Sequence, residues 1–305
     1  MLYSKSTPEQ KRIRLREALA SGRIQQFPGA FNPLSARLIE EKGFPGVYIS
    51  GAVLANDLGL PDIGLTTLTE VATRAGQIAR MTELPAIVDA DTGFGEPMNV
   101  ARTVQELENA GLAGCHIEDQ VNPKRCGHLD GKAVVDLDTA LQRIRAAADA
   151  RRDPNFLIMA RTDVRATGEG PAGLDAAVAR AKALVDAGAD AIFPEAMGSL
   201  EEFKAIRDAV DVPILANMTE FGKSRLFTVE ELAGVGINLV IYPVTLLRIA
   251  MGAAERTLEA IAAHGTQEDQ VGNMLTRSRL YELVDYEAYN RFDAGVFNFQ
   301  VPGRY

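Results

Sequence analysis

The stretch PAIVDADTGFGEP, residues 85–97, contains a complete change from a strand to a helix. Its apolar run ends at Asp89, the chain then breaks at Gly93 and Gly95, and a helical pattern begins near Pro97. A short apolar run bounded by turn residues is typical of a buried strand. This stretch therefore predicts one strand-to-helix unit of an α/β fold.

The same unit recurs through most of the chain. Eight apolar runs have the length of a strand, and alanine-rich amphipathic segments such as 174–187 and 200–210 lie between them. The runs are IQQFPGA ending near Gly29, GVYIS at Ser50, PAIVDAD at Asp89, GCHIED at Glu118, FLIMARTD at Arg161, AIFPE at Glu195, PILANMT at Asn217 and LVIYP at Tyr242. Eight such units predict a TIM (β/α)8 barrel at about residues 24–265, within a single domain of residues 1–305. The stretch MLTRSRLYELVDYEAY, within about 270–305, predicts one further helix that packs on the barrel or on a neighbour.

The composition excludes several classes of protein. The chain has 305 residues, 47% hydrophobic content, a formal net charge of -9 and an isoelectric point near 5.0. A chain of this length and composition can bury a large core. Its net negative charge gives no indication of the basic surface that binds nucleic acid. The first residues are charged and polar, and no apolar run approaches bilayer length. We expect a soluble, cytoplasmic protein with no nucleic-acid or membrane partner, in which the basic run KRIRLR at residues 11–16 decorates one solvated helix.

Polar residues end seven of the eight runs, although the strands of a barrel are interior and should be apolar. They are Ser50, Asp89, Glu118, Arg161, Glu195, Asn217 and Tyr242. In a TIM barrel the carboxyl ends of the strands meet at one face, where active sites form. The pattern therefore predicts an active site built from these strand ends.

Asp89 and Asp91 stand at alternate positions at the end of one strand. Two or three hard carboxylate oxygens at the mouth of a barrel suit Mg²⁺, which keeps water molecules and takes further ligands from a substrate. Glu118, at the end of the next strand, is a candidate acceptor for a metal-bound water. The alternative is that the two aspartates only cap the helix that begins near Pro97. With Glu118 on the neighbouring strand, the pattern favours a metal site.

Arg161 closes an apolar strand, where an unpaired charge is costly. It therefore needs a substrate anion or a carboxylate such as Glu195 as its partner, and a buried ion pair between these two residues is the alternative to a functional role. Asn217 and Thr219 are neutral hydrogen-bond donors that suit a substrate carboxylate, although a helix cap explains them equally well. These residues predict a carboxylate-binding side of the site.

The loop NPKRCGHLDGK, residues 122–132, places Cys126 in a cationic segment without helical or strand period. A thiol acts in nucleophilic or acid/base chemistry only when its pKa is tuned, and Lys124, Arg125 and His128 would stabilise the thiolate. A glycine-bounded loop over a barrel mouth is typical of a mobile lid that excludes water during chemistry. An inert surface cysteine is the alternative. The chain has only two cysteines, so no disulfide framework is expected.

Eight short motifs carry a resemblance to a known family. They are SGA at residues 50–52, VDADTGFG, HIEDQ, KRCGH, MARTD, FPEA, PILANMTEFG and YP followed by LR. Their order and spacing resemble those of the isocitrate lyase and phosphoenolpyruvate mutase superfamily over almost the whole chain. The chain is most similar to members that act on 2-methylisocitrate, which implies Mg²⁺-dependent cleavage of this tricarboxylate to pyruvate and succinate in the methylcitrate cycle of propionate breakdown.

Other readings of the motifs remain. Isocitrate lyases carry large insertions that this chain lacks, and phosphoenolpyruvate mutases and oxaloacetate-cleaving relatives lack the KRCGH loop. A non-catalytic barrel that binds a dicarboxylate is the alternative from a different class of protein.

The resemblance also implies a role for each matching residue. Asp89 and Asp91 match the metal carboxylates, and Cys126 matches the general acid of the catalytic loop. Ser50, Gly51, Ala52, Gly127, Arg161, Glu195, Asn217, Thr219, Arg248 and Arg277 match substrate contacts. Where the family commonly has Ser-Gly-Gly this chain has Ala52, and the backbone contact survives that change only if φ of Ala52 is negative. Arg248 and Arg277 would, on their own, be assigned to the surface.

The general base is left open between Tyr48, Asp62 and a metal-bound water. Phe193, Ile241 and Pro243 are candidates for an apolar slot that accepts the substrate methyl, with ordinary barrel packing as the alternative. The resemblance implies a homotetramer in which the C-terminal helix is exchanged between subunits, whereas the residues alone show a spare amphipathic segment.

Overall fold

A computed structural model describes residues 3–125, 131–168, 170–222 and 224–298. Within these ranges it has eight strands, one at each predicted apolar run. The strands are β1 (Gln25–Pro28), β2 (Val47–Ile49), β3 (Ala86–Asp89), β4 (Gly114–Glu118), β5 (Leu157–Thr162), β6 (Ala191–Pro194), β7 (Leu215–Asn217) and β8 (Leu239–Tyr242). Their side chains are buried on both faces, which is typical of parallel strands covered by helices.

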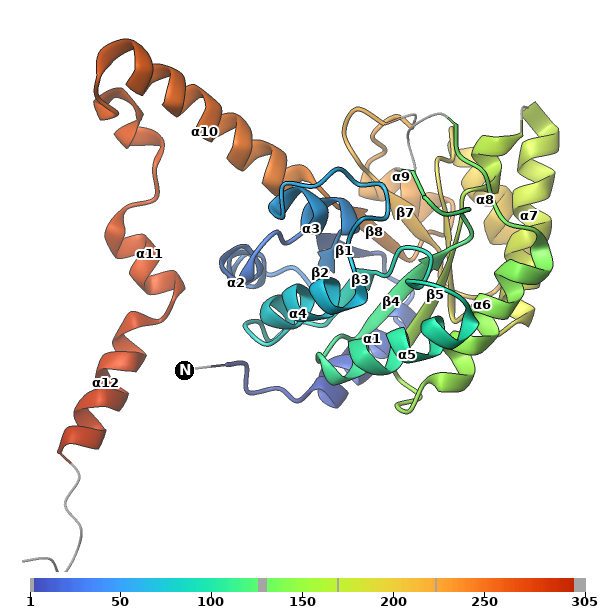
Figure 1. Ribbon diagram of the computed structural model, residues 1–305, viewed down its shortest axis with the longest axis horizontal. Coiled ribbons are helices and arrows are strands. Elements are labelled where there is room, and N and C mark those ends of the chain that lie inside the picture. Colours follow the sequence, from blue (N-terminus) through green and yellow to red (C-terminus); the bar gives the residue numbers. More distant parts are fainter. Residues whose placement is uncertain (1–2, 126–130, 169, 223, 299–305) are drawn as a thin grey trace, which may run out of the picture.

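The paired strands all run parallel (Figure 1). Strands β2 to β6 form one sheet in chain order, and β1, β8 and β7 form a second sheet. Single parallel bridges join the two sheets, from Gly29 to Tyr48 at one junction and from Ile192 to Ile214 at the other. The order of strands therefore returns to β1, as predicted for a TIM (β/α)8 barrel.

Helices follow the strands and cover the outside of the sheets (Figure 1). In the described ranges they are α1 (Pro8–Ala20), α2 (Pro33–Glu41), α3 (Gly51–Asp57), α4 (Leu68–Ala79), α5 (Pro97–Asn109), α6 (Leu137–Ala150), η1 (Val164–Thr167), α7 (Gly170–Asp186), α8 (Leu200–Ala209), α9 (Val229–Gly234), α10 (Thr245–His264), η2 (Glu268–Asn273), α11 (Arg277–Leu283) and α12 (Tyr286–Phe297). The predicted segments 174–187 and 200–210 correspond to α7 and α8. A large apolar cluster lies between strands and helices, and alternate strand residues such as Phe27, Leu157 and Leu239 form a smaller one inside the ring.

Helix α1 covers the end of the barrel where the strands begin. Lys11 and Arg12 are buried, and their side chains donate to main-chain carbonyls near the ends of two other helices. Nζ of Lys11 lies 2.7 Å from the carbonyl of Ala79, and Nη2 of Arg12 lies 2.7 Å from that of Glu108. The last carbonyls of a helix have no partner inside it, so these cations satisfy α4 and α5. The predicted solvated role of residues 11–16 is therefore wrong for Lys11 and Arg12.

Two residues of α1 test its packing against the barrel. Leu15 is 0% exposed in the cluster inside the ring, whereas Ile13 is 39% exposed. We expect Leu15→Ala to lower the free energy of unfolding by about 2–5 kcal/mol, because it removes buried methyl groups and leaves a cavity. Ile13→Ala is the matched control and should cost less than about 1 kcal/mol. Urea titration followed by circular dichroism measures both; equal losses would contradict this role of α1.

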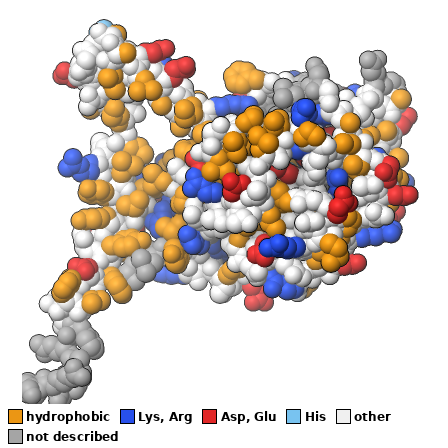
Figure 2. Space-filling view, viewed as in Figure 1, with side chains coloured by type: hydrophobic (Ala, Val, Ile, Leu, Met, Phe, Trp, Pro, Cys, Tyr) orange, Lys and Arg blue, Asp and Glu red, His pale blue; other side chains and the backbone are white. Residues whose placement is uncertain are grey.

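The chain from α10 to α12, residues 245–297, leaves the barrel and is called the C-terminal arm (Figure 1). One helix was predicted near its end, but the structure has two, because Asp285 takes a left-handed conformation with φ 57 that ends the helical path. Large apolar side chains on the arm are exposed, including Ile249, Leu258 and Phe292 (Figure 2). Among the helices of the described residues, none has the length and apolar character needed to cross a membrane.

Candidate active site

The predicted residues gather around one cavity at the carboxyl ends of the strands. Its volume is about 650 Å³. The predicted substrate and metal residues that line it are Ser50, Ala52, Asp89, Arg161, Glu195, Asn217, Thr219 and Arg248. Most of them lie at or just after strand ends, whereas Arg248 lies in the first turn of α10. The polar strand ends therefore converge, as their positions in a barrel predict.

Asp89 is the last residue of β3 and Asp91 follows it by two positions; both are 5% exposed. The main-chain N–H of Asp91 donates to Oδ1 of Asp89 at 2.9 Å, and that of Gly51 donates to Oδ2 at 3.3 Å. A Cβ at Gly51 would lie 2.9 Å from Oδ2 of Asp89, so a side chain here would push into the carboxylate. The N-cap of α5 is Glu96. The two aspartates therefore do not cap this helix; Asp89 lines the cavity, and Asp91 lies next to it.

Lys124 brings a positive charge into this acidic cluster. Its side chain is 3% exposed, and Nζ forms ion pairs with Asp62 and, at 2.9 Å, with Oδ1 of Asp91. Burial alone lowers the pKa of Lys124, but the neighbouring carboxylates, Asp91 first, outweigh this effect and raise it, so the side chain is an ammonium. Sequence reasoning assigned Lys124 only to the thiolate and missed these ion pairs, because Asp62 lies 62 positions away along the chain.

The donor atoms of this cluster fit a hard divalent cation. In the part of the chain that the structure describes, no group of three or more His, Cys, Asp or Glu side chains is placed to hold a metal ion. Two aspartates remain, which suits Mg²⁺ because this ion commonly keeps several waters or takes substrate oxygens as ligands. Burial and the neighbouring Asp89 raise the pKa of Asp91 to about 6. A bound cation would favour the ionised form of Asp91 over the protonated form.

Glu118 lies behind the aspartates, at the end of β4, and is 1% exposed. Neither of its carboxylate oxygens accepts a hydrogen bond from the described residues. Burial raises the pKa of Glu118 well above its usual range. A buried carboxylate without such a bond is costly, and water held by a cation is a donor that would satisfy it. The surroundings of Glu118 are therefore compatible with its predicted role as an acceptor for a metal-bound water.

Arg161 lies at the centre of a buried ion-pair network and is 7% exposed. Its Nη2 lies 3.1 Å from Oε2 of Glu195, so the buried ion pair that was the alternative to a functional role is present. Its Nε lies 3.3 Å from Glu118 and 2.9 Å from Asp163. The ring of Phe193 lies 5.0 Å from the guanidinium. An arginine held by several partners presents its remaining donors to a substrate carboxylate with little reorganisation.

Tyr48 and His116 form a hydrogen bond inside the barrel. The phenolic oxygen lies 2.8 Å from Nε2 of His116, and the two side chains come from β2 and β4. Burial raises the pKa of Tyr48 well above its usual range, and burial lowers that of His116 to about 4. Both groups are therefore neutral, and Nδ1 of His116, which lies 3.7 Å from Oδ1 of Asp89, has no hydrogen-bond partner among the described residues. Tyr48 keeps its proton and is a poor candidate for the general base.

The opposite wall of the cavity comes from the start of α10. Nη1 of Arg248 donates to Oγ1 of Thr219 at 3.2 Å and to Oε2 of Glu220 at 2.8 Å. Nδ2 of Asn217 donates to Glu195 at 3.4 Å. Neutral donors and a guanidinium are thus held at this wall by carboxylates, an arrangement that suits an anionic ligand.

The apolar part of the wall differs from the predicted slot. Pro243 lines the cavity, but Phe193 and Ile241 are 0% exposed and lie behind it. Val244 and Leu247, which line the cavity from the start of the arm, were missed. Both residues are visible in the sequence as apolar positions within YPVTLLR, residues 242–248, but the buried face of an ordinary helix has the same pattern.

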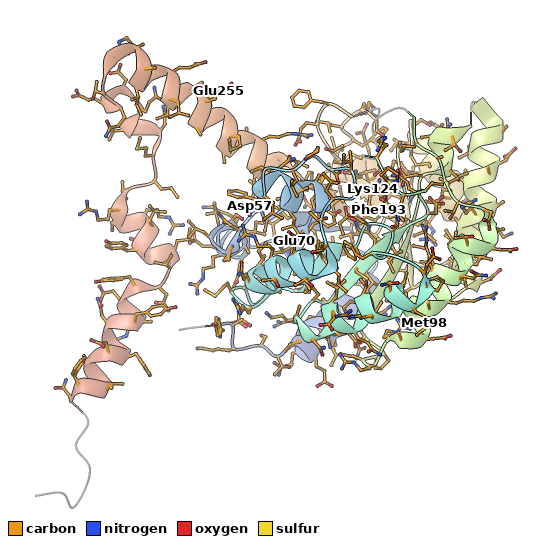
Figure 3. All side chains as sticks on the ribbon, in the orientation of Figure 1. Asp57, Glu70, Met98, Lys124, Phe193 and Glu255 are labelled. Atoms are coloured by element: carbon orange, nitrogen blue, oxygen red, sulfur yellow. The ribbon has the colours of Figure 1, made fainter. Side chains whose placement is uncertain are left out.

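The structure bears differently on the remaining predicted site residues. Ala52 lies in α3 and does not have a positive φ, so its backbone N–H is compatible with the predicted contact. Arg277 begins α11 on the C-terminal arm and is exposed, so this chain does not bring it to its own cavity. Figure 3 shows Lys124 within the barrel and Glu255 out on the arm. Cys126, Gly127 and His128 lie outside the described residues.

The chain is similar to known proteins over almost its whole length. The family model described as phosphoenolpyruvate phosphomutase matches residues 15–262. The chain belongs to this family. A protein of Corynebacterium glutamicum named probable 2-methylisocitrate lyase 2 is 61% identical over 299 residues, which cover 98% of this chain and 96% of that protein.

Two solved structures show how far the family resemblance extends. Oxaloacetate acetylhydrolase in complex with the inhibitor 3,3-difluorooxalacetate is 35% identical with a TM-score of 0.88, covering 97% of this chain and 100% of that chain. Phosphonopyruvate hydrolase in complex with oxalate and Mg²⁺ is 29% identical with a TM-score of 0.82, covering 96% and 99%. The phosphoenolpyruvate phosphomutase model ends at residue 262, whereas these structures also match most of the C-terminal arm.

Proposed function

We propose that this chain is a 2-methylisocitrate lyase, which cleaves 2-methylisocitrate to pyruvate and succinate with Mg²⁺. The observation that carries the proposal is one cavity lined by Asp89, Arg161 and Arg248, with Asp91 directly beside it and hydrogen-bonded to Asp89 through its main-chain N–H. A 2-hydroxy tricarboxylate needs both features, because its carboxylates need cationic partners and its hydroxyl needs an electrophile. The relative that is 61% identical and carries the same name supports the choice of substrate.

The reaction breaks the bond between C2 and C3 of a 2-hydroxy acid. A base removes the hydroxyl proton, the C2 oxygen becomes a carbonyl, and the electron pair of the broken bond stays on the carbon that becomes part of succinate. Mg²⁺ bound at Asp89 and Asp91 would supply a Lewis acid for the hydroxyl and its adjacent carboxylate. Arg161 holds a carboxylate and stabilises the charge that develops on it. Cys126 donates the proton that the carbanion takes up, as a general acid.

The base is Asp62 in this proposal. Asp62 lines the cavity and its carboxylate is held by Lys124. Tyr48 also lines the cavity, but burial raises its pKa, so its phenol remains protonated and acts as a hydrogen-bonding group.

The proposed assembly is a cytoplasmic homotetramer in which the C-terminal arm packs on a neighbouring subunit. Exposed apolar side chains on the arm, such as Ile249 and Leu258, support this proposal because a monomer would leave them in water. Exchange of the arm would also allow Arg277 to reach the cavity of another subunit. Light scattering on the full chain measures the mass of the assembly, and a monomer at working concentration would contradict the proposal.

A panel of substrates tests the proposed function. We expect succinate and pyruvate from 2-methylisocitrate, complete loss of activity with a chelator, and recovery with Mg²⁺. Isocitrate should be cleaved with a kcat/KM roughly 10- to 200-fold lower, because one methyl in an apolar slot is worth about 1–3 kcal/mol. Oxaloacetate and phosphonopyruvate, tested in the same way, should give little product. Turnover of these two acids alone would overturn the proposal.

A further inference from the structure

Asp163 follows the end of β5 and has no role in the chemistry described so far. It is 0% exposed and lies behind the cavity wall. Its carboxylate accepts hydrogen bonds from two cations: Nε and Nη2 of Arg161 at 2.9 and 3.2 Å, and Nζ of Lys132 at 2.7 Å. The side chain of Lys132 is itself 2% exposed. One fully buried carboxylate therefore joins a residue of the cavity wall to the segment that follows residues 126–130.

The position of Asp163 is itself set by neighbouring groups. Its main-chain N–H donates to Oδ1 of Asp119 at 2.9 Å, and the hydroxyl of Thr162 donates to Oδ2 of Asp119 at 2.6 Å. Arg180 forms an ion pair with the same carboxylate at 3.2 Å. Asp119 and Arg180 thus hold the backbone at Asp163, and the Asp163 carboxylate has little freedom to move away from Arg161.

The two donors of Arg161 that contact Asp163 define the plane of its guanidinium. A two-point contact between a guanidinium and a carboxylate fixes orientation as well as distance. Without the Asp163 charge, the guanidinium would keep Glu195 at 3.1 Å and Glu118 at 3.3 Å as its partners and would turn toward them. Of those two carboxylates Glu195 lines the cavity, so the turn would commit to it donors that a substrate carboxylate needs.

We infer that Asp163 is a positioning residue that orients Arg161 toward the substrate carboxylate and, through Lys132, holds the segment after residues 126–130 to the same wall. This inference rests on the proposed function, because it concerns the carboxylate that Arg161 receives. It separates two effects. Loss of the Asp163 charge weakens its contacts with both Arg161 and Lys132. Loss of the Lys132 charge leaves the contact between Asp163 and Arg161 in place.

Four variants of the full chain test this inference: Asp163→Asn, Lys132→Met, Lys132→Arg, and the double variant that combines the first two. For Asp163→Asn we expect KM for 2-methylisocitrate to rise roughly 10- to 100-fold, the loss that accompanies a hydrogen bond to a charged group, and kcat to fall several-fold because the contact with Lys132 is lost as well. For Lys132→Met we expect kcat to fall several-fold with KM unchanged, and Lys132→Arg should restore it because it keeps the cation. The double variant should match Asp163→Asn alone, because their shared contact is already lost.

The control is Asp153→Asn, which removes an aspartate paired with Arg12 at 2.9 Å at the opposite end of the barrel. It should change stability and leave kcat and KM unaltered. Unaltered kinetics in folded Asp163→Asn would overturn the inference; if this variant does not fold, unaltered kcat in Lys132→Met would overturn it. If the wild type does not cleave 2-methylisocitrate, the proposed function fails separately, and the variants are compared on whichever acid of the panel the wild type consumes.

Discussion

Replacing Asp91 with asparagine is expected to remove most of the Mg²⁺-dependent turnover while leaving the barrel folded. The amide keeps the size of the side chain but loses the negative charge that a hard divalent cation prefers. Metal-ion catalysis contributes several kcal/mol, so we expect kcat/KM to fall by roughly 10²- to 10³-fold. Calorimetric titration with Mg²⁺ should show weaker binding in the same variant.

The stability of this variant should move in the opposite direction. Burial and Asp89 raise the pKa of Asp91 to about 6, so at neutral pH the fold holds a charge that its surroundings disfavour. Asparagine removes that charge, and Lys124 keeps its ion pair with Asp62. We therefore expect the melting temperature without metal to be equal or higher, and the stabilisation by added Mg²⁺ to be smaller.

Asp57→Asn is the matched control for this experiment. Asp57 lines the cavity together with Asp89, but it lies at the end of α3 and pairs with Arg74. Its replacement should leave the Mg²⁺ dependence of turnover unchanged. A metal response in Asp91→Asn equal to that of the control would show that Asp91 does not hold the cation.

The strands were predictable because their signal is local. Each apolar run is a few residues long and can be recognised on its own. Because the carboxyl ends of barrel strands meet at one face, polar strand ends such as Asp89, Arg161 and Asn217 are then expected to be neighbours in space. The pair of Arg161 and Glu195 was predictable for a further reason, since a buried arginine needs a carboxylate.

The contacts that sequence reasoning missed join residues far apart along the chain. Tyr48 and His116 are separated by 68 positions, and Lys11 reaches a carbonyl 68 positions away. A basic run at the start of a helix has the same pattern whether it faces water or the ends of other helices. The break at Asp285 was missed because its flanking residues keep a helical pattern on both sides, and a single left-handed residue leaves no periodic signal.

Replacing Cys126 with serine is expected to lower kcat by roughly 10²- to 10⁴-fold, the usual contribution of general acid–base catalysis. Cys126 lies outside the described residues, so this prediction rests on the sequence and on the described residues before and after 126–130. The segments that flank residues 126–130 are anchored by ion pairs: Lys124 pairs with Asp91 at 2.9 Å, and Lys132 pairs with Asp163 at 2.7 Å. A serine hydroxyl is a much weaker acid than a thiol, so proton delivery to the carbanion slows while binding of Mg²⁺ and substrate persists.

Cys115→Ala distinguishes this effect from a general effect of losing a thiol. Cys115 is 1% exposed in β4, and burial raises its pKa, so it takes no part in proton transfer at neutral pH. Its replacement should cost stability without changing kcat. Calorimetry with 2-methylisocitrate and Mg²⁺ on Cys126→Ser should still show binding, which a non-catalytic dicarboxylate-binding barrel would also show. The two cases separate in the wild type, because only an enzyme releases succinate there and loses that release when the thiol is removed.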